Sequence, residues 1–291
     1  MDLLAYWRWD NYCADLDEGA GFNFNSHQRR LHTAIEVGER LWLVTGRPSP
    51  DGIRYVLVGM LTVSAKTFNP PSYKYGRYRV WGNLANSAYY SADGPDAAPL
   101  LMRLEFVPPS PIRSQDKIGQ SLQTIRSLSP DDSALLSQWA ANLPLELRAY
   151  QLADEFVLEQ AYERGQEVLR EALERYHIGV SPQRKVTLQT TYYVRNRSLV
   201  GILQEMYNGR CQLCGFDPRL LYGVTACNAH HIVYLSRGGR DELENLLLVC
   251  PNHHRVIHAA NAAFDFKDLH YVFPNGRREP LVLNLHLPRA V

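Results

Sequence analysis

The sequence predicts an α+β protein built from three successive parts, and three features of the chain indicate this class. Strand-like runs of β-branched and aromatic residues fill the N-terminal part, and an apolar periodicity typical of helices follows it. The last part concentrates cysteine and histidine among mixed strand and helix signals. We therefore expect an N-terminal β-rich domain over residues 1–128, a helical linker over 129–180 and a C-terminal domain over 181–291.

The N-terminal part shows strands separated by turns. Residues 41–45 and 55–63 are rich in β-branched and aromatic side chains, and the segment 46–52 between them carries glycine and proline. This order predicts a hairpin. Further strands are expected over 78–81 and 100–106, and the proline cluster that follows is expected to end the unit.

The middle part has the pattern of two acidic helices. Ser129 offers an N-cap before Pro130 at the first helical position, and apolar residues recur at intervals of three and four between residues 152 and 173. Pro144 is expected to divide the segment, and the second helix should end near Gly179. We interpret the charged face as solvated surface and the segment as a spacer between the flanking domains.

Four cysteine and histidine residues of the C-terminal part have the spacing of a structural zinc site. Cys211 and Cys214 are separated by two residues, and Cys250 and His253 repeat that spacing. Three thiolates and one imidazole complete a closed tetrahedral site for Zn²⁺. Cys227 is the competing fourth ligand, but its spacing fits neither pair.

A second set of residues is left over by that zinc site. His254 and His258 are four residues apart, so both imidazoles project from one face if the segment after Pro251 is helical. His230 and His231 are adjacent, so in an extended segment one can bind a metal while the other faces a substrate. Taken alone, each of these histidines is more typical of a surface or core residue than of a metal ligand. Together they predict a divalent-cation site beside a general base.

These residues, with Gly238 and Gly239 before Asn245, resemble the HNH (ββα-metal) nuclease family, in the branch pinned by a zinc knuckle. The resemblance covers about the last third of the chain. It implies that His231 is the catalytic general base and that Asn245 orients the loop of that base. It implies that one catalytic cation, Mg²⁺, Mn²⁺ or another divalent ion, is held by a set of three histidines: His230, His254 and His258. His253 departs from the cysteine usual at its position, which zinc tolerates. The implied products are a 5′-phosphate and a 3′-hydroxyl.

The N-terminal part resembles the PUA-like barrel superfamily, which includes the SRA, EVE and YTH readers of modified bases. The resemblance rests on strand order and on residues 35–44, and it implies a β-barrel that extrudes a modified nucleotide into an aromatic pocket. Aromatic and basic residues are interleaved here as stacking and phosphate contact require. The candidates for DNA or base binding are Trp42, Tyr73, Tyr75, Arg77, Tyr78 and Trp81. For any one aromatic residue, a place in the barrel core is the competing interpretation.

Composition favours a cytoplasmic protein that binds a polyanion. The formal net charge is +1 over 291 residues, but it divides into +2 for residues 1–128, −6 for 129–179 and +5 for 180–291. Seven of the ten histidines lie in the last segment. Five cysteines at these spacings indicate reduced thiols with a metal, not a disulfide framework. The N-terminus lacks a signal-peptide pattern, and no apolar run approaches a membrane span.

Taken together, the sequence predicts a modification-dependent DNA endonuclease that resembles type IV restriction enzymes. It would hydrolyse double-stranded DNA carrying 5-methyl- or 5-hydroxymethylcytosine, as in restriction or phage defence. The alternatives are an HNH nuclease of a phage or mobile element, a reader of phosphorothioate DNA, and a zinc-stabilised DNA-binding protein without catalysis. Because one HNH site cuts one strand, we expect a homodimer.

Overall fold

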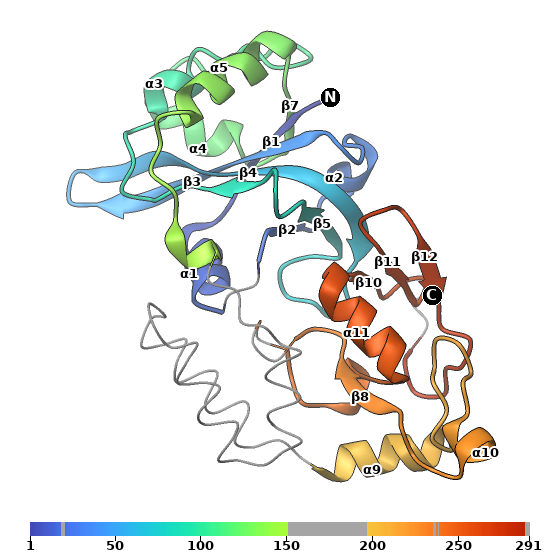
Figure 1. The fold of residues 1–291 in the computed structure, drawn as a ribbon. Coiled ribbons are helices and arrows are strands. Elements are labelled where there is room, and N and C mark those ends of the chain that lie inside the picture. Colours follow the sequence, from blue (N-terminus) through green and yellow to red (C-terminus); the bar gives the residue numbers. More distant parts are fainter. Residues whose placement is uncertain (19–20, 151–196, 235–236, 238, 289–291) are drawn as a thin grey trace. The chain divides into compact units, whose positions relative to one another are not determined.

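The computed structural model describes residues 1–18, 21–150, 197–234, 237 and 239–288, which form two compact units. Residues 1–16 and 21–150 make up unit 1, and the described residues from 197 onward belong to unit 2 (Figure 1). The second helix expected in the linker lies outside the described residues. No helix in the described part of the chain is long and apolar enough to cross a membrane.

A mixed sheet forms the centre of unit 1. Its hydrogen-bonded order is β2-β5-β4-β3-β1-β7, with the short β6 paired to β4. The strands are β1 (Leu3–Tyr6), β2 (Asn23–Ser26), β3 (Arg40–Ser49), β4 (Gly52–Phe68), β5 (Tyr78–Gly82), β6 (Ala88–Tyr89) and β7 (Arg126–Ser127). The helices are α1 (Trp9–Glu18), α2 (Arg30–Thr33), α3 (Ala98–Leu101), α4 (Ile118–Ser121) and α5 (Pro130–Ala140).

The two central strands confirm the predicted hairpin. β3 pairs antiparallel with β4 from Arg40 opposite Thr62 to Ser49 opposite Gly52, with an irregularity at Leu43 and Val44. β4 then continues past β3 and pairs with β5. The strand predicted over 78–81 is therefore confirmed as part of β5.

The sheet of unit 1 is open, so the expected closed barrel is wrong for the described residues. β2 and β7 end the strand order and do not pair with each other. Alternate residues of one strand enter different cores: Leu41 and Leu43 pack on the face of α1, whereas Trp42 packs on the face of α3 and α5. A barrel encloses a single interior. Here the sheet is open, and helices cover each of its two faces, as Figure 1 shows. Because both faces are buried, the strands are apolar along nearly their whole length.

The strand predicted over 100–106 is wrong, because this segment begins as the last turn of α3. Pro99 lies in the first turn of that helix, where its missing N–H costs nothing. Leu100, Leu101 and Leu104 are buried against the sheet. A short buried apolar run fits a helix as well as a strand, so periodicity alone could not separate them.

The first linker helix belongs to unit 1. α5 starts after Ser129, whose hydroxyl accepts the Asp132 amide N–H at 3.0 Å while the Asp132 carboxylate accepts the Ser129 amide. This capping box confirms the predicted N-cap. The same carboxylate accepts the amides of Glu105 and Phe106 at 2.9 and 3.0 Å. Asp132 thus ties α5 to the segment after α3.

Unit 2 is assembled from short elements around one apolar core. β8 and β9 form an antiparallel pair, and β10, β11 and β12 form a three-stranded sheet. The strands are β8 (Asn228–His231), β9 (Leu246–Val249), β10 (Ala263–Asp265), β11 (His270–Val272) and β12 (Arg278–Pro280). The helices are α9 (Arg197–Met206), α10 (Pro218–Tyr222) and α11 (Pro251–Ala260). The order β8, β9, α11 is the expected ββα arrangement.

Candidate metal centres and nuclease site

The ββα segment brings two metal-ligand groups together through local rules. Cys250 is the N-cap residue of α11 and Pro251 its first residue, so the helix starts directly after β9. This confirms the helix expected after Pro251. In the β8–β9 pair, His230 lies opposite Leu247 and His231 opposite Leu246, which fixes both histidines at the end of the hairpin.

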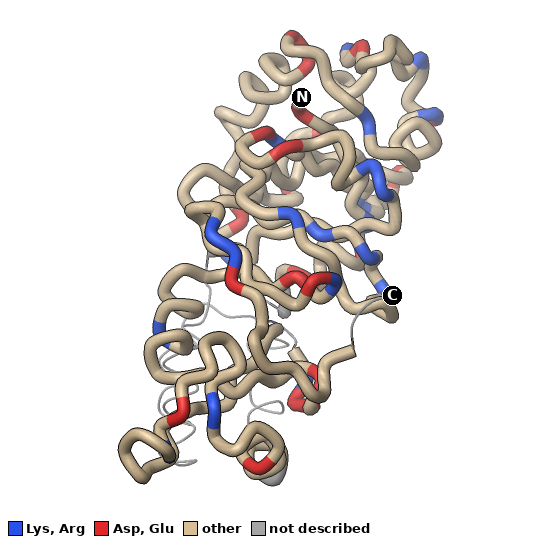
Figure 2. The backbone as a smooth tube through the Cα atoms, turned by 90° about the vertical axis from the view of Figure 1, so that its right-hand side faces the viewer, with Lys and Arg blue, Asp and Glu red and all other residues tan. Residues whose placement is uncertain are grey.

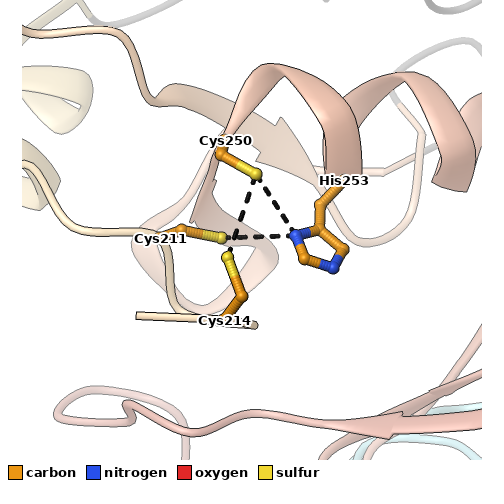
Figure 3. Close-up of side chains that lie close together, drawn as sticks. All are labelled: Cys211, Cys214, Cys250 and His253. Carbon is orange, nitrogen blue, oxygen red and sulfur yellow. Dashed lines mark hydrogen bonds between the residues drawn. The ribbon is translucent and has the colours of Figure 1, made fainter. Parts of the chain in front are cut away.

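The first group consists of Cys211, Cys214, Cys250 and His253, with one potential ligand atom of each within 4.8 Å of the others. His253 Nδ1 lies 3.2 Å from Cys250 Sγ and 3.7 Å from Cys211 Sγ, and the Sγ atoms of Cys214 and Cys250 are 4.0 Å apart (Figure 3). These spacings suit ligands around one tetrahedral Zn²⁺. The four residues predicted from spacing are therefore brought together, and the group could hold zinc.

The loop between Cys211 and Cys214 is fixed to the hairpin by Gln212. Gln212 N–H donates to the Leu248 carbonyl at 2.8 Å, and its side-chain oxygen accepts the Leu248 amide at 2.7 Å. Gly215 adopts a φ of +72°, and its amide closes the turn onto the Cys211 carbonyl at 2.8 Å. A left-handed residue is needed there, which glycine adopts without a steric penalty. The turn therefore presents both thiols toward α11.

The thiols of Cys211 and Cys250 interact in the absence of a metal. A hydrogen bond from the Cys211 thiol lowers the pKa of Cys250, and the same bond raises the pKa of Cys211. Thiolates are the form in which cysteines bind metals. Burial raises the pKa of Cys227 to about 12, and Cys227 lies outside the group. None of the five cysteines is in a disulfide.

Glu279 of β12 contacts this group, although no sequence spacing pointed to it. Its Oε2 lies 3.3 Å from His253 Nε2, and its Oε1 accepts from Arg277 Nε at 2.6 Å. A carboxylate on the outer imidazole nitrogen keeps the other nitrogen directed at a metal. Glu279 could not be identified beforehand, because the pairing of β12 with β11 brings it there.

The second group consists of His230, His254 and His258. His258 Nε2 lies 3.1 Å from His230 Nδ1 and 3.2 Å from His254 Nε2. The ring of Tyr234 stacks on His258 with centroids 5.0 Å apart. Three imidazole nitrogens that converge from β8 and one face of α11 fit a divalent cation and leave positions for other ligands. The ligand set expected from the resemblance is therefore brought together.

His231 follows His230 of this group on β8, and Asn245 holds the loop that comes after His231. Asn245 Oδ1 accepts the Val233 amide at 2.8 Å, and its Nδ2 donates to the carbonyls of Val233 and Arg240 at 2.9 and 2.8 Å. One amide side chain thus joins the two ends of the loop after His231. At Gly239 a Cβ would lie 1.9 Å from the Val233 carbonyl oxygen, so the close approach requires glycine.

Asp241 also contacts His231, and the sequence interpretation missed it. Its Oδ1 lies 3.1 Å from His231 Nε2, and the side chains of Asp241 and His231 are 13% and 0% exposed. The available signal was weak, since an aspartate after a pair of glycines is typical of many turns. Only the loop geometry brings it to the histidine.

A third group with metal-ligand chemistry is formed by Asp265, Asp268 and His270 at the turn between β10 and β11. Asp265 Oδ1 accepts the amides of Lys267 and Asp268 at 2.9 and 3.1 Å. These hydrogen bonds give the carboxylate a sufficient structural role in the turn. We assign no function to this group.

The six candidates for base binding divide into two kinds. Trp42 is 1% exposed and lies in the core between the sheet and α3 and α5, so its prediction as a DNA contact is wrong. Its side chain points inward because β3 is covered on both faces. The other five are half-buried around β5 and the loop before it: Tyr73, Tyr75, Arg77, Tyr78 and Trp81. Arg79 lies between Tyr73 and Trp81, 5.0 Å from each ring centroid.

A closed Cys₃His group beside an open histidine group on a ββα element is the architecture of a metal-dependent nuclease. Consistent with it, residues 211–260 match the family model "HNH endonuclease", and this segment is an HNH endonuclease domain. The chain is homologous to the type IV methyl-directed restriction enzyme EcoKMcrA of Escherichia coli strain K12, with 30% identity over 82 residues. The match spans 28% of this chain and 30% of that enzyme.

Two solved structures of restriction endonucleases align with the chain at low similarity. The modification-dependent restriction endonuclease TagI aligns over 87% of this chain and 59% of its own, with 16% identity and a TM-score of 0.28. The type IV phosphorothioation-dependent restriction endonuclease ScoMcrA aligns over 80% and 41%, with 17% identity and a TM-score of 0.21. These scores are too low to establish a shared overall fold.

Proposed function

We propose that the chain is a modification-dependent DNA endonuclease whose HNH domain cuts DNA that the N-terminal unit selects. The observation that carries the proposal is the presence of two separate ligand groups in one domain. Cys211, Cys214, Cys250 and His253 form a closed set suited to structural zinc. The histidine group next to His231 is open and suited to a cation that binds a phosphate.

In this proposal the residues of the HNH domain divide the chemistry. His230, His254 and His258 hold the divalent cation, Mg²⁺ or Mn²⁺, which would stabilise charge on the scissile phosphate and the leaving oxygen when bound. His231 takes the proton from the attacking water, and Asn245 holds the loop of that base through its three hydrogen bonds. A single site of this kind cuts one strand, so a double-strand break would require two copies of the chain.

Target choice is proposed to lie in unit 1. The half-buried aromatic residues around β5 alternate with Lys74 and Arg77, and Lys74 Nζ lies 4.4 Å from the Tyr75 ring centroid. Such a surface can stack on an extruded base and contact phosphates. The charge distribution gives less support to DNA binding than these aromatic residues do, because acidic and basic residues are interspersed along the backbone (Figure 2). The E. coli relative is a methyl-directed enzyme, which supports methylated DNA as the substrate, and we propose modified cytosine as the base that is read.

The test is cleavage of matched duplexes with Mg²⁺ or Mn²⁺. The duplexes would be unmodified, 5-methylcytosine, 5-hydroxymethylcytosine and phosphorothioate DNA. We expect cutting of a modified-cytosine duplex and little cutting of the unmodified one. If phosphorothioate DNA were cut in preference, we would conclude that unit 1 recognises a modified DNA backbone and not a modified base. Binding without cutting under every metal would reject the enzyme.

A further inference from the structure

A buried cation lies among polar side chains near one edge of the sheet in unit 1. Arg79 of β5 is opposite Asn25 of β2 and Thr67 of β4, so the three side chains share one face of the sheet. Arg79 is 8% exposed and Thr67 is 1% exposed. Arg79 Nε donates to Asn25 Oδ1 at 2.6 Å. The guanidinium is therefore buried beside neutral groups.

Two aromatic rings constrain the orientation of this guanidinium. Its central carbon lies 5.0 Å from the ring centroids of Tyr73 and Trp81. Trp81 is itself held, because its Nε1 donates to Thr67 Oγ1 at 2.9 Å. Contact with the rings and the hydrogen bond from Nε fix the plane of the guanidinium. The two terminal nitrogens of Arg79 are thus presented in a defined direction.

The loop that carries Tyr73 is anchored on the same polar face. Asn69 Nδ2 donates to the Gly76 carbonyl at 2.7 Å and to Asn25 Oδ1 at 2.8 Å. Gly76 has a φ of +115°, and a Cβ there would lie 2.1 Å from the Ser26 carbonyl carbon. Glycine is therefore required for this close approach of the loop to β2. The backbone of the loop sets the place of Tyr73 beside the guanidinium.

No carboxylate neutralises Arg79 within the residues that the structure describes. The one hydrogen bond of its side chain there is the bond from Nε. Residues 21–35 and 52–92, which supply β2, β4, β5 and their loops, contain seven lysines and arginines but no aspartate or glutamate. Burial of a charge is costly unless the charge is paired and hydrogen-bonded. The terminal nitrogens of Arg79 are therefore suited to an anionic ligand.

We propose that Arg79 binds a phosphate group of the DNA backbone through Nη1 and Nη2. A guanidinium offers parallel N–H donors that match two phosphate oxygens. A base edge is neutral and would leave the buried charge unbalanced, which favours phosphate over a base as the ligand. The inference rests on the proposed function, because DNA supplies the phosphate. In this role Arg79 positions the strand and does not read the modification.

Phosphate binding can be measured on the wild type without DNA. We would label arginine with ¹⁵N in the full-length, zinc-loaded protein and follow the Nε–H signals during titration with inorganic phosphate. Sodium chloride at equal ionic strength is the control titration. Arg79 is assigned by NOEs to the rings of Tyr73 and Trp81, so no variant is required. Its signal should shift and saturate with phosphate only, and the exposed Arg103 should respond to neither salt specifically. An Arg79 signal that responds alike to both salts would overturn the inference.

The salt dependence of DNA binding tests whether the phosphate belongs to the backbone. One phosphate contact adds about 0.9 to the slope of log K against log salt concentration. Arg79→Gln should lower the slope by about that amount and weaken binding about 10- to 100-fold, on modified and unmodified duplexes alike. Arg79→Lys keeps the charge and should keep the slope. Arg103→Gln, which removes an exposed positive charge, should bind like the wild type.

The outcomes separate this inference from the proposed function. An unchanged slope in a folded Arg79→Gln protein, or a loss confined to the modified duplex, would show that Arg79 does not bind the backbone. If Arg79→Gln does not fold, the wild type decides: its Arg79 signal should shift when the duplex is added, and one methylphosphonate linkage should abolish that shift. A shift that survives at every linkage tested would reject the contact. Equal binding of all duplexes by the wild type would instead reject modification reading, while the phosphate titration would still decide the role of Arg79.

Discussion

The two units of this protein are stabilised in different ways, although each has its own apolar core. In unit 1 the strands β3 and β4 are 10 and 17 residues long and carry a core on each face of the sheet. In unit 2 the strands have three or four residues, and the ligand groups lie at their ends. Short strands bury little apolar surface, so such units usually need a metal or disulfide in addition. Unit 1 should fold without metal, and unit 2 should depend on it.

The largest expected effect is the loss of zinc from unit 2. Cys211→Ser should abolish zinc binding and unfold unit 2, because apparent binding free energies of structural zinc are about 10–16 kcal/mol and add to folding. Unit 1 should stay folded. Zinc analysis with hydrogen exchange resolved by segment would measure both.

The control for this variant is Cys227→Ser, a cysteine outside the ligand group. It should retain zinc. A folded wild type that contains no zinc would contradict the expectation that unit 2 depends on metal. So would a Cys211→Ser protein whose unit 2 shows the hydrogen exchange of the wild type.

The next-largest expected effect is a loss of activity with no loss of stability. His231→Gln should reduce cleavage by about 100-fold or more, the scale of a missing general base, and should leave zinc content and DNA binding unchanged. The exposed His27 of unit 1 provides a control, since His27→Gln removes a histidine that lies outside both groups. Wild-type cutting rates in His231→Gln would place the base elsewhere, and His230 would be examined first.

A smaller effect tests unit 1, whose stability should depend on hydrogen bonding and packing. Asp132→Ala removes a buried carboxylate that accepts three amide hydrogen bonds, and it should lower the free energy of unfolding of unit 1 by about 2 kcal/mol. Asp131→Ala, at an exposed neighbouring site, should change it little. Denaturation of the zinc-loaded protein would compare them, and equal midpoints would show that the Asp132 contacts do not stabilise the unit.

The smallest effect is a pH dependence of unit 2. Burial lowers the pKa of His286, whose Nε2 donates to the Leu246 carbonyl at 3.0 Å and whose Nδ1 accepts the Tyr207 hydroxyl at 2.6 Å. The folded state therefore resists protonation more than the unfolded state. This contribution is complete above the ordinary histidine pKa of about 6.5 and is lost as pH falls below it. His286→Gln should flatten the pH dependence as pH falls below about 6.5, and an unchanged slope there would exclude His286 as its source.

The sequence by itself determined the parts of this protein that depend on short-range spacing. Two residues between Cys211 and Cys214 predict a turn that presents both thiols, and the four-residue interval from His254 to His258 predicts one helical face. The structure brings these pairs together with Cys250, His253 and His230 in the two ligand groups. The β3–β4 hairpin and the Ser129 cap were predictable for the same reason. Each is set by a local turn or by the helical period.

Tertiary structure alone decided what depends on residues that are distant in the chain or on which face is covered. Glu279 reaches His253 through the pairing of β12 with β11, and Asp241 reaches His231 because Asn245 closes the loop between them. Trp42 is a core residue because helices cover both faces of an open sheet. A residue's own sequence neighbourhood does not encode its partners across a sheet or loop, since the contact is selected by the packing of the whole unit.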